Sequence, residues 1–167
     1  RSSWGENIGW SRGWNPHYST DTQLNVSWSD FSQPSTKDAN RDGITYALNL
    51  QNNWQLPVHN MKLSAGVGGS LSDTQGSQFD AMGFNGSVGA TYSFGKKLDV
   101  NAGYRVNRIK FEDRITMTQT YSASFFKSWT NTFSTSLGLS YVDGYGSVGN
   151  VYDYTRRLAM LSFYYQM

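Results

Sequence analysis

The chain contains no cysteine, which excludes a disulfide framework, thiolate chemistry and a thiolate metal site. It has no run of about 18 apolar residues, which excludes a transmembrane helix. Charged residues make up only 16% of the 167 residues, and the net charge of +2 is too small to indicate a nucleic-acid partner. The first residues do not include Met or a signal-peptide pattern, so we expect either a removed leader or a fragment of a longer chain.

Aromatic residues are plentiful, in contrast to charged ones. They account for 16% of the chain, with 6 Trp and 11 Tyr, whereas hydrophobic residues as a whole reach only 38%. Low charge combined with few aliphatic residues is compatible with disorder, but disordered chains also lack aromatics. We therefore expect a folded chain that is rich in aromatic, Ser, Thr, Asn and Gly residues.

Hydrophobic residues recur at every second position along most of the chain, which is the period of a β-strand. The stretch GVGGSLSD, residues 66–73, continues an apolar series that begins at Met61, while its other face is nearly bare. We predict about nine strands of roughly ten residues each, and no helix. These strands are expected at residues 4–14, 24–29, 44–51, 61–72, 82–94, 98–107, 116–125, 133–141 and 158–167.

The connections between the predicted strands alternate in length. Short turns are expected at residues 15–17, 55–60, 95–97 and 127–131, and longer loops at residues 32–43, 73–81 and 143–150. The turn at residues 112–114 is an exception, being short where a long loop is expected. No linker interrupts the pattern, so residues 1–167 are predicted to form a single domain.

The second face of the predicted strands is neutral, which is unusual for a sheet in water. A soluble β-sandwich exposes charged residues on its outer faces. Alternating strands, short turns at one end and longer loops at the other are typical of an antiparallel transmembrane β-barrel, here of about 8–10 strands. We expect an aromatic girdle at the membrane interface near the short turns, formed by Trp10, Trp14, Trp54, Tyr92, Phe94, Trp129, Phe163 and Tyr165.

The C-terminal strand, LSFYYQM, resembles the terminal signal of bacterial outer-membrane β-barrel proteins, in which alternate apolar residues lead to a final aromatic residue. The chain ends in Met167 instead of that aromatic. The resemblance covers nearly the whole chain at the level of architecture and names no functional family. It implies location in the bacterial outer membrane, short turns on the periplasmic side, and recognition of the last strand by the barrel-assembly machinery.

Two features favour a barrel wider than this chain can close alone. The predicted strand number is odd, whereas bacterial single-chain barrels usually have an even number. The inward face also has little side-chain volume to fill a small barrel. The chain is then the C-terminal part of a larger barrel or one contributor to a shared barrel; the alternative is a self-contained barrel. The residues expected to face the lumen are Asn25, Ser27, Asn49, Gln51, Lys62, Ser64, Gly66, Gly68, Asn85, Ser87, Asp99, Asn101, Arg105, Thr118, Ser122 and Ser136.

The sequence offers little catalytic chemistry. Its only histidines, His17 and His59, fall in predicted turns, and no acid–base pair or metal-ligand spacing accompanies them. We predict no enzyme, no cofactor and no metal. The leading expectation is a pore with a polar, weakly charged lumen, followed by a structural barrel that anchors or sheathes an envelope component, with an outer-membrane hydrolase third. The predicted partners are the lipid bilayer and either further copies or another envelope protein, without nucleic acid.

Overall fold

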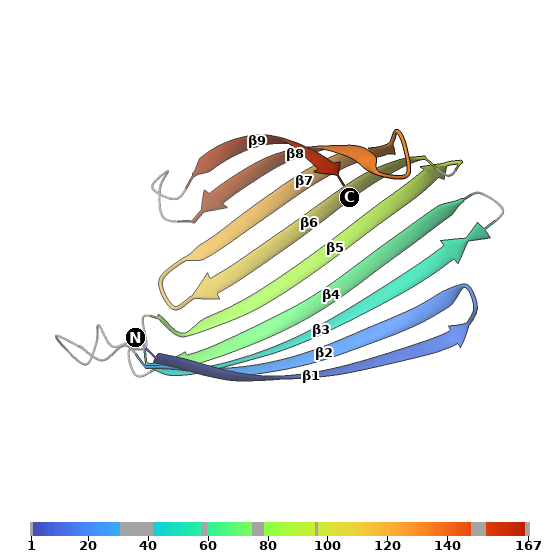
Figure 1. Ribbon diagram of the computed structural model, residues 1–167. Coiled ribbons are helices and arrows are strands. Elements are labelled where there is room, and N and C mark those ends of the chain that lie inside the picture. Colours follow the sequence, from blue (N-terminus) through green and yellow to red (C-terminus); the bar gives the residue numbers. More distant parts are fainter. Residues whose placement is uncertain are drawn as a thin grey trace.

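The computed structural model describes residues 2–30, 42–57, 60–74, 79–95, 97–147 and 153–165. These residues form one antiparallel sheet in which each strand pairs with its neighbours in chain order (Figure 1). None of them belongs to a helix long and apolar enough to cross a membrane. The strands are β1 (Ser2–Asn15), β2 (Tyr18–Asp30), β3 (Gly43–Leu56), β4 (Met61–Thr74), β5 (Ala81–Phe94), β6 (Leu98–Phe111), β7 (Ile115–Ser128), β8 (Phe133–Gly146) and β9 (Tyr154–Tyr165).

The predicted number of strands is confirmed, but the predicted lengths are wrong. Strands contain 12 to 14 residues instead of about ten. The difference lies in polar segments that the sequence places in loops. Asp143, for example, pairs with Gln119 on β7 and Thr155 on β9, and so belongs to β8. Cross-strand pairing overrides the low intrinsic strand propensity of such residues.

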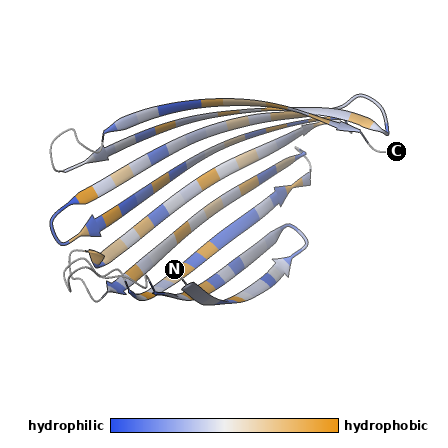
Figure 2. Cartoon of the chain, turned by 60° about the vertical axis from the view of Figure 1, so that its left-hand side comes forward, coloured by the Kyte–Doolittle hydropathy of each residue, from blue (hydrophilic) through white to orange (hydrophobic). Residues whose placement is uncertain are grey.

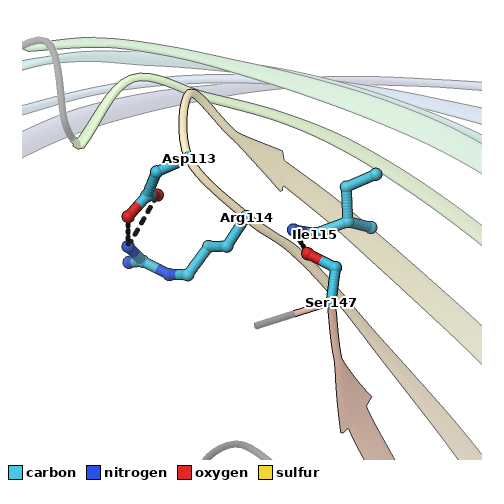
Figure 3. A network of polar contacts seen from close by, with 4 residues as sticks. All are labelled: Asp113, Arg114, Ile115 and Ser147. Atoms are coloured by element: carbon cyan, nitrogen blue, oxygen red, sulfur yellow. Dashed lines mark hydrogen bonds and ion pairs between the residues drawn. The ribbon is translucent and has the colours of Figure 1, made fainter. Parts of the chain in front are cut away.

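The two ends of the sheet differ in their connections. The turn end carries the β1–β2, β3–β4, β5–β6 and β7–β8 hairpin turns, and the loop end carries the other connections. Positive φ angles at Asn60 (49°) and Gly95 (64°) make two of the tight turns possible. At the loop end, the backbone N–H of Ile115 donates to Ser147 Oγ (2.8 Å) and that of Ser147 donates to the Ile115 carbonyl (2.9 Å). Arg114 and Asp113 form an ion pair at 3.0 Å in the same region (Figure 3).

The sheet is not closed into a barrel, which corrects the expectation of a self-contained barrel. Strands β1 and β9 are its two edges, and neither is hydrogen-bonded to the other in the described sheet. Both strands begin at the loop end and run toward the turn end, so they point in the same direction (Figure 1). Closure by direct β1–β9 pairing would therefore create a parallel seam in an otherwise antiparallel sheet.

The described residues form a single layer without a hydrophobic core. No apolar side chain among them is buried, and large apolar side chains are exposed on every strand except β6. Directly paired residues project on the same side of a sheet, and the register joins Leu50 to Val67 and Gln51 to Gly66. From β1 to β8 the same separation gives one largely apolar face and one largely polar face. Hydrophobic and hydrophilic positions are accordingly interspersed along the strands (Figure 2).

The sheet is strongly curved (Figures 1 and 2), and the crowding around its glycines indicates that the polar face is on the inside. Glycines of the polar face are crowded by side chains from neighbouring strands: a Cβ on Gly66 would lie 2.7 Å from Gln51 Oε1. On the apolar face, a Cβ on Gly69 would find its nearest atom at 3.7 Å. Side chains converge on a concave surface and diverge on a convex one. The sheet thus has a concave polar face and a convex apolar face.

Candidate functional site

The concave polar face contains every residue that the sequence predicts to face a lumen. The register places, for example, Asn49, Gly68 and Asn85 in one row across three strands, and Ser87 opposite Arg105. The face is therefore largely polar from β1 to β8. Its assignment to the lumen of a pore stays a prediction, because the sheet is open.

Glycine in β4 allows the side chains of β3 and β5 to meet over its backbone. Asn85 Nδ2 donates to Asn49 Oδ1 at 3.3 Å, and Gly68 lies between these two residues in the row. A side chain at position 68 would occupy the path of this bond. The nearly bare stretch of residues 66–73 thus supports close approach of polar groups on the concave face.

A second polar row crosses β5, β6 and β7. Thr91 Oγ1 donates to Asn101 Oδ1 at 2.6 Å, and Asn101 Nδ2 donates to Ser124 Oγ at 3.0 Å. These side chains are part-buried by the curvature of the sheet. Their mutual hydrogen bonds fix the position of the groups that the concave face presents.

Charge on the concave face is sparse and mixed in sign. The sequence predicted Lys62, Asp99 and Arg105 there, and the register adds Asp21 and Arg156, which the prediction missed. Asp21 accepts hydrogen bonds from Ser11 Oγ (2.5 Å) and Asn53 Nδ2 (2.7 Å). The alternation of faces along a strand could have identified both residues, because Asp21 is four positions from the predicted lumen residue Asn25 on β2 and Arg156 is six positions from Ser162 on β9.

The concave face changes character toward β9. Leu158 and Met160 project from it and border a hollow of about 340 Å³, whose floor is made of small residues such as Gly89, Gly103 and Ser122. Farther along β9, Tyr164 lies 6.4 Å from Phe126, measured between ring centroids. The last strand therefore carries apolar side chains on both faces along most of its length.

The convex apolar face carries aromatic residues in two bands. One band lies near the turn end, where the sequence predicted it, and includes Trp54 and Tyr92. A second band near the loop end was not predicted. In four places, an aromatic residue of one band is eight positions along the chain from an aromatic residue of the other band. The pairs are Tyr46 and Trp54 on β3, Phe84 and Tyr92 on β5, Tyr121 on β7 and Trp129 in the following turn, and Tyr141 and Phe133 on β8.

The midpoints of these pairs are Leu50, Val88, Phe125 and Leu137, all apolar and all exposed on the convex face. Eight residues span about 26 Å along a strand at about 3.3 Å per residue. The convex face thus has a wide apolar zone that is bordered by aromatic rings on both sides.

The strands are inclined to the axis of the curved sheet. One row of paired residues begins at Leu56, the last residue of β3, and reaches Leu137, four residues inside β8. The stagger is close to one residue per strand, which corresponds to a slant of roughly 30–35° for strands about 4.8 Å apart. The separation of the aromatic bands along the axis is then about 22 Å.

Charged residues of the convex face lie toward the strand ends. Arg12 and Lys127 are near the turn end, whereas Glu6, Asp73, Arg108, Lys110, Asp143 and Arg157 are nearer the loop end. Thr20 is the one side chain of the described residues that is polar and buried, at 8% exposure. The apolar zone between the bands carries no charged residue on the described strands.

The predicted interface aromatics of the turn end occupy the convex side. The register of the strands places six of them on this side: Trp10, Trp54, Tyr92, Phe94, Phe163 and Tyr165. Trp14 lies at a bulge at the end of β1 and Trp129 in the turn after β7. His17 is exposed in the first turn, whereas His59, Gln166 and Met167 lie outside the described residues.

The described part of the chain contains no group of three or more His, Cys, Asp or Glu side chains that could hold a metal ion. Comparison with known proteins also gives no assignment: no protein-family model matches the chain, and no curated protein matches it significantly. The two faces of the sheet are therefore the features that bear on function.

Proposed function

We propose that this sheet is part of a transmembrane β-barrel of the bacterial outer membrane and that its concave polar face lines a water-filled pore. The observation that carries the proposal is the convex apolar face with its two aromatic bands. Outer-membrane barrels have an apolar band about 25 Å tall between two aromatic girdles, and the bands here are about 22 Å apart along the axis. An exposed apolar face of this extent is typical of a surface that contacts a membrane or another protein.

The open edges support a barrel with further strands. Because β1 and β9 run in the same direction, two copies joined edge to edge in one orientation would meet in parallel seams. Antiparallel pairing of two copies would turn one copy upside down, with its loop end where the other has its turn end. A wholly antiparallel barrel therefore needs an odd number of additional strands between β9 and β1.

The chemistry of the concave face favours uncharged cargo. Its surface consists mainly of Ser, Thr, Asn and Gly, with the few charges of both signs described above. Hydroxyl and amide groups both donate and accept hydrogen bonds, which suits polar neutral solutes such as saccharides. A strongly ionic solute would find no ring of like charge to select it.

A structural barrel that anchors or sheathes an envelope component is the second candidate. The apolar side chains of Leu158 and Met160 on the concave face favour it, because a water-filled pore would leave their apolar surface exposed to water, which is unfavourable. A partner inside the barrel would cover them. No observation on the described strands favours the third expectation, an outer-membrane hydrolase.

Cysteine accessibility tests the proposal, because the chain has no native cysteine. Ser87→Cys on the concave face and Val88→Cys on the convex face form a matched pair of adjacent residues. In the membrane-embedded protein, a charged, membrane-impermeant thiol reagent should modify position 87 and leave position 88 unmodified. Equal modification of both positions would refute membrane embedding.

Single-channel recording of the same two variants separates the two candidates. If the concave face lines a pore, modification at position 87 adds bulk and charge to the lumen and lowers the conductance. Modification at 87 without any conductance before or after it would favour the structural barrel. Native mass spectrometry of the protein extracted from its own membrane then identifies the polypeptide that supplies the additional strands.

A further inference from the structure

Two hairpins on opposite flanks of the sheet share the same arrangement of a cation, a tryptophan and a threonine. In the β1–β2 hairpin, the guanidinium of Arg12 lies 4.1 Å from the ring centroid of Trp14, and Trp14 Nε1 donates to Thr20 Oγ1 at 3.0 Å. In the β7–β8 hairpin, Lys127 Nζ lies 3.8 Å from the ring centroid of Trp129, and Trp129 Nε1 donates to Thr135 Oγ1 at 3.0 Å. The sequence spacing is identical in both.

The arrangement is not a general consequence of hairpin geometry. At the corresponding turn-end positions of the other two hairpins, Trp54 is preceded two residues earlier by Asn52, and Phe94 by Tyr92. Neither pair provides a cation. The repeated set is therefore a feature of two particular hairpins.

The tryptophan rings are held firmly while their cations remain available. The bond to threonine satisfies each indole N–H, and the rings stay half exposed, at 52% for Trp14 and 49% for Trp129. Within the described residues, the ion pair found is that of Arg114, and neither Arg12 nor Lys127 has a carboxylate partner. Both cations thus keep unused hydrogen-bond donors.

The first of the two sites is the more extensively constructed. Trp14, Tyr18 and Trp54 stack in sequence, with centroid distances of 6.5 and 5.6 Å. Thr20 Oγ1 in turn donates a hydrogen bond to Asn52 Oδ1 at 2.8 Å. The Trp14 ring that contacts Arg12 is therefore held in place by residues of β2 and β3.

Both sites lie on the convex face within the turn-end aromatic band. Tryptophan occupies the headgroup level of a bilayer, and Arg and Lys extend their charged groups toward that level. An anionic phosphate is the group that a stacked cation with free donors binds there.

We propose that Arg12 with Trp14, and Lys127 with Trp129, are two binding sites for the phosphate of anionic membrane lipids, whose headgroups carry no cation of their own to pair with it. The inference rests on the proposed membrane location, and it assigns a specific lipid contact to each flank of the sheet. The cation binds the phosphate, the indole ring fixes the direction of the cation, and the threonine fixes the ring.

Lipid retention in nanodiscs tests this assignment. The whole protein is inserted into phosphatidylcholine nanodiscs that contain increasing fractions of phosphatidylglycerol, and the lipids that remain bound after release are counted by native mass spectrometry. We expect preferential retention of phosphatidylglycerol, about fivefold per site, which is the size of one juxtamembrane Lys or Arg contact. The double variant Arg12→Gln, Lys127→Gln should lose the preference, and Arg12→Lys should keep most of it.

The matched control is Lys110→Gln, on the same face but in the loop-end region, where no tryptophan lies beneath the cation. It should retain the preference of the unchanged protein. An equal loss in this control would attribute the effect to general surface charge and overturn the proposal. If the protein inserts but retains both lipids equally, the lipid sites are refuted alone; if it does not insert at all, the proposed function fails with them.

Discussion

Substitution of Gly68 by alanine tests the packing of the concave face. A Cβ at this position would collide with Asn49 Oδ1, and would lie 2.7 Å from Asn85 Nδ2 and 2.9 Å from the Leu48 carbonyl oxygen. The side chains of Asn49 and Asn85 must separate, which removes their hydrogen bond at a cost of about 1 kcal/mol. Displacing the Leu48 backbone adds about 1–3 kcal/mol.

Alanine also gains about 0.5–1 kcal/mol over glycine through its lower conformational entropy in the unfolded chain. The net loss of unfolding free energy for Gly68→Ala is therefore about 2 kcal/mol. The control is Gly69→Ala on the convex face, where the added Cβ meets its nearest atom at an ordinary 3.7 Å. That variant should be unchanged or slightly more stable.

The assay is equilibrium unfolding in guanidinium chloride, monitored by tryptophan fluorescence, with the protein inserted in the same lipid or detergent for all variants. Two adjacent glycines are then compared under identical conditions. Equal unfolding free energies for Gly68→Ala and Gly69→Ala would refute the assignment of position 68 to a crowded concave face.

Further outcomes follow from the same two faces. Leu137→Arg places a charge midway between the aromatic bands and should destabilise the inserted protein by about 2–4 kcal/mol in the same unfolding assay, whereas Ser136→Arg on the concave face should cost little; comparable losses would contradict the membrane orientation. Asp21→Ala removes the acceptor of two hydrogen bonds from Ser11 and Asn53, and should lower the unfolding free energy by about 1.5–3 kcal/mol in the same assay. An unchanged unfolding free energy would contradict a stabilising role for these bonds.

The number of strands and the face of each residue could be predicted from the sequence. Val67 and Gly68 lie on opposite faces because successive residues of a strand alternate, and this holds whatever the strand pairs with. The ends of the strands were less predictable. Asp143 carries the signature of a loop, and only its partners on β7 and β9 bring it into the sheet.

The aromatic band at the turn end was also readable from the sequence, since Trp54 and Tyr92 stand next to predicted turns. The band at the loop end was not, because residues such as Tyr46 and Phe84 lie well inside their strands. Their common level becomes apparent only when the register fixes the offset between neighbouring strands.

The alternation of apolar and neutral residues by itself determined an all-β chain with one apolar and one polar face, because side-chain direction is a local property of extended backbone. The tertiary structure alone decided the inward curvature of the polar face, the open edges at β1 and β9, and the contact of Asn49 with Asn85. These depend on register and curvature, which are set by pairing between distant segments and have no signal in the local pattern.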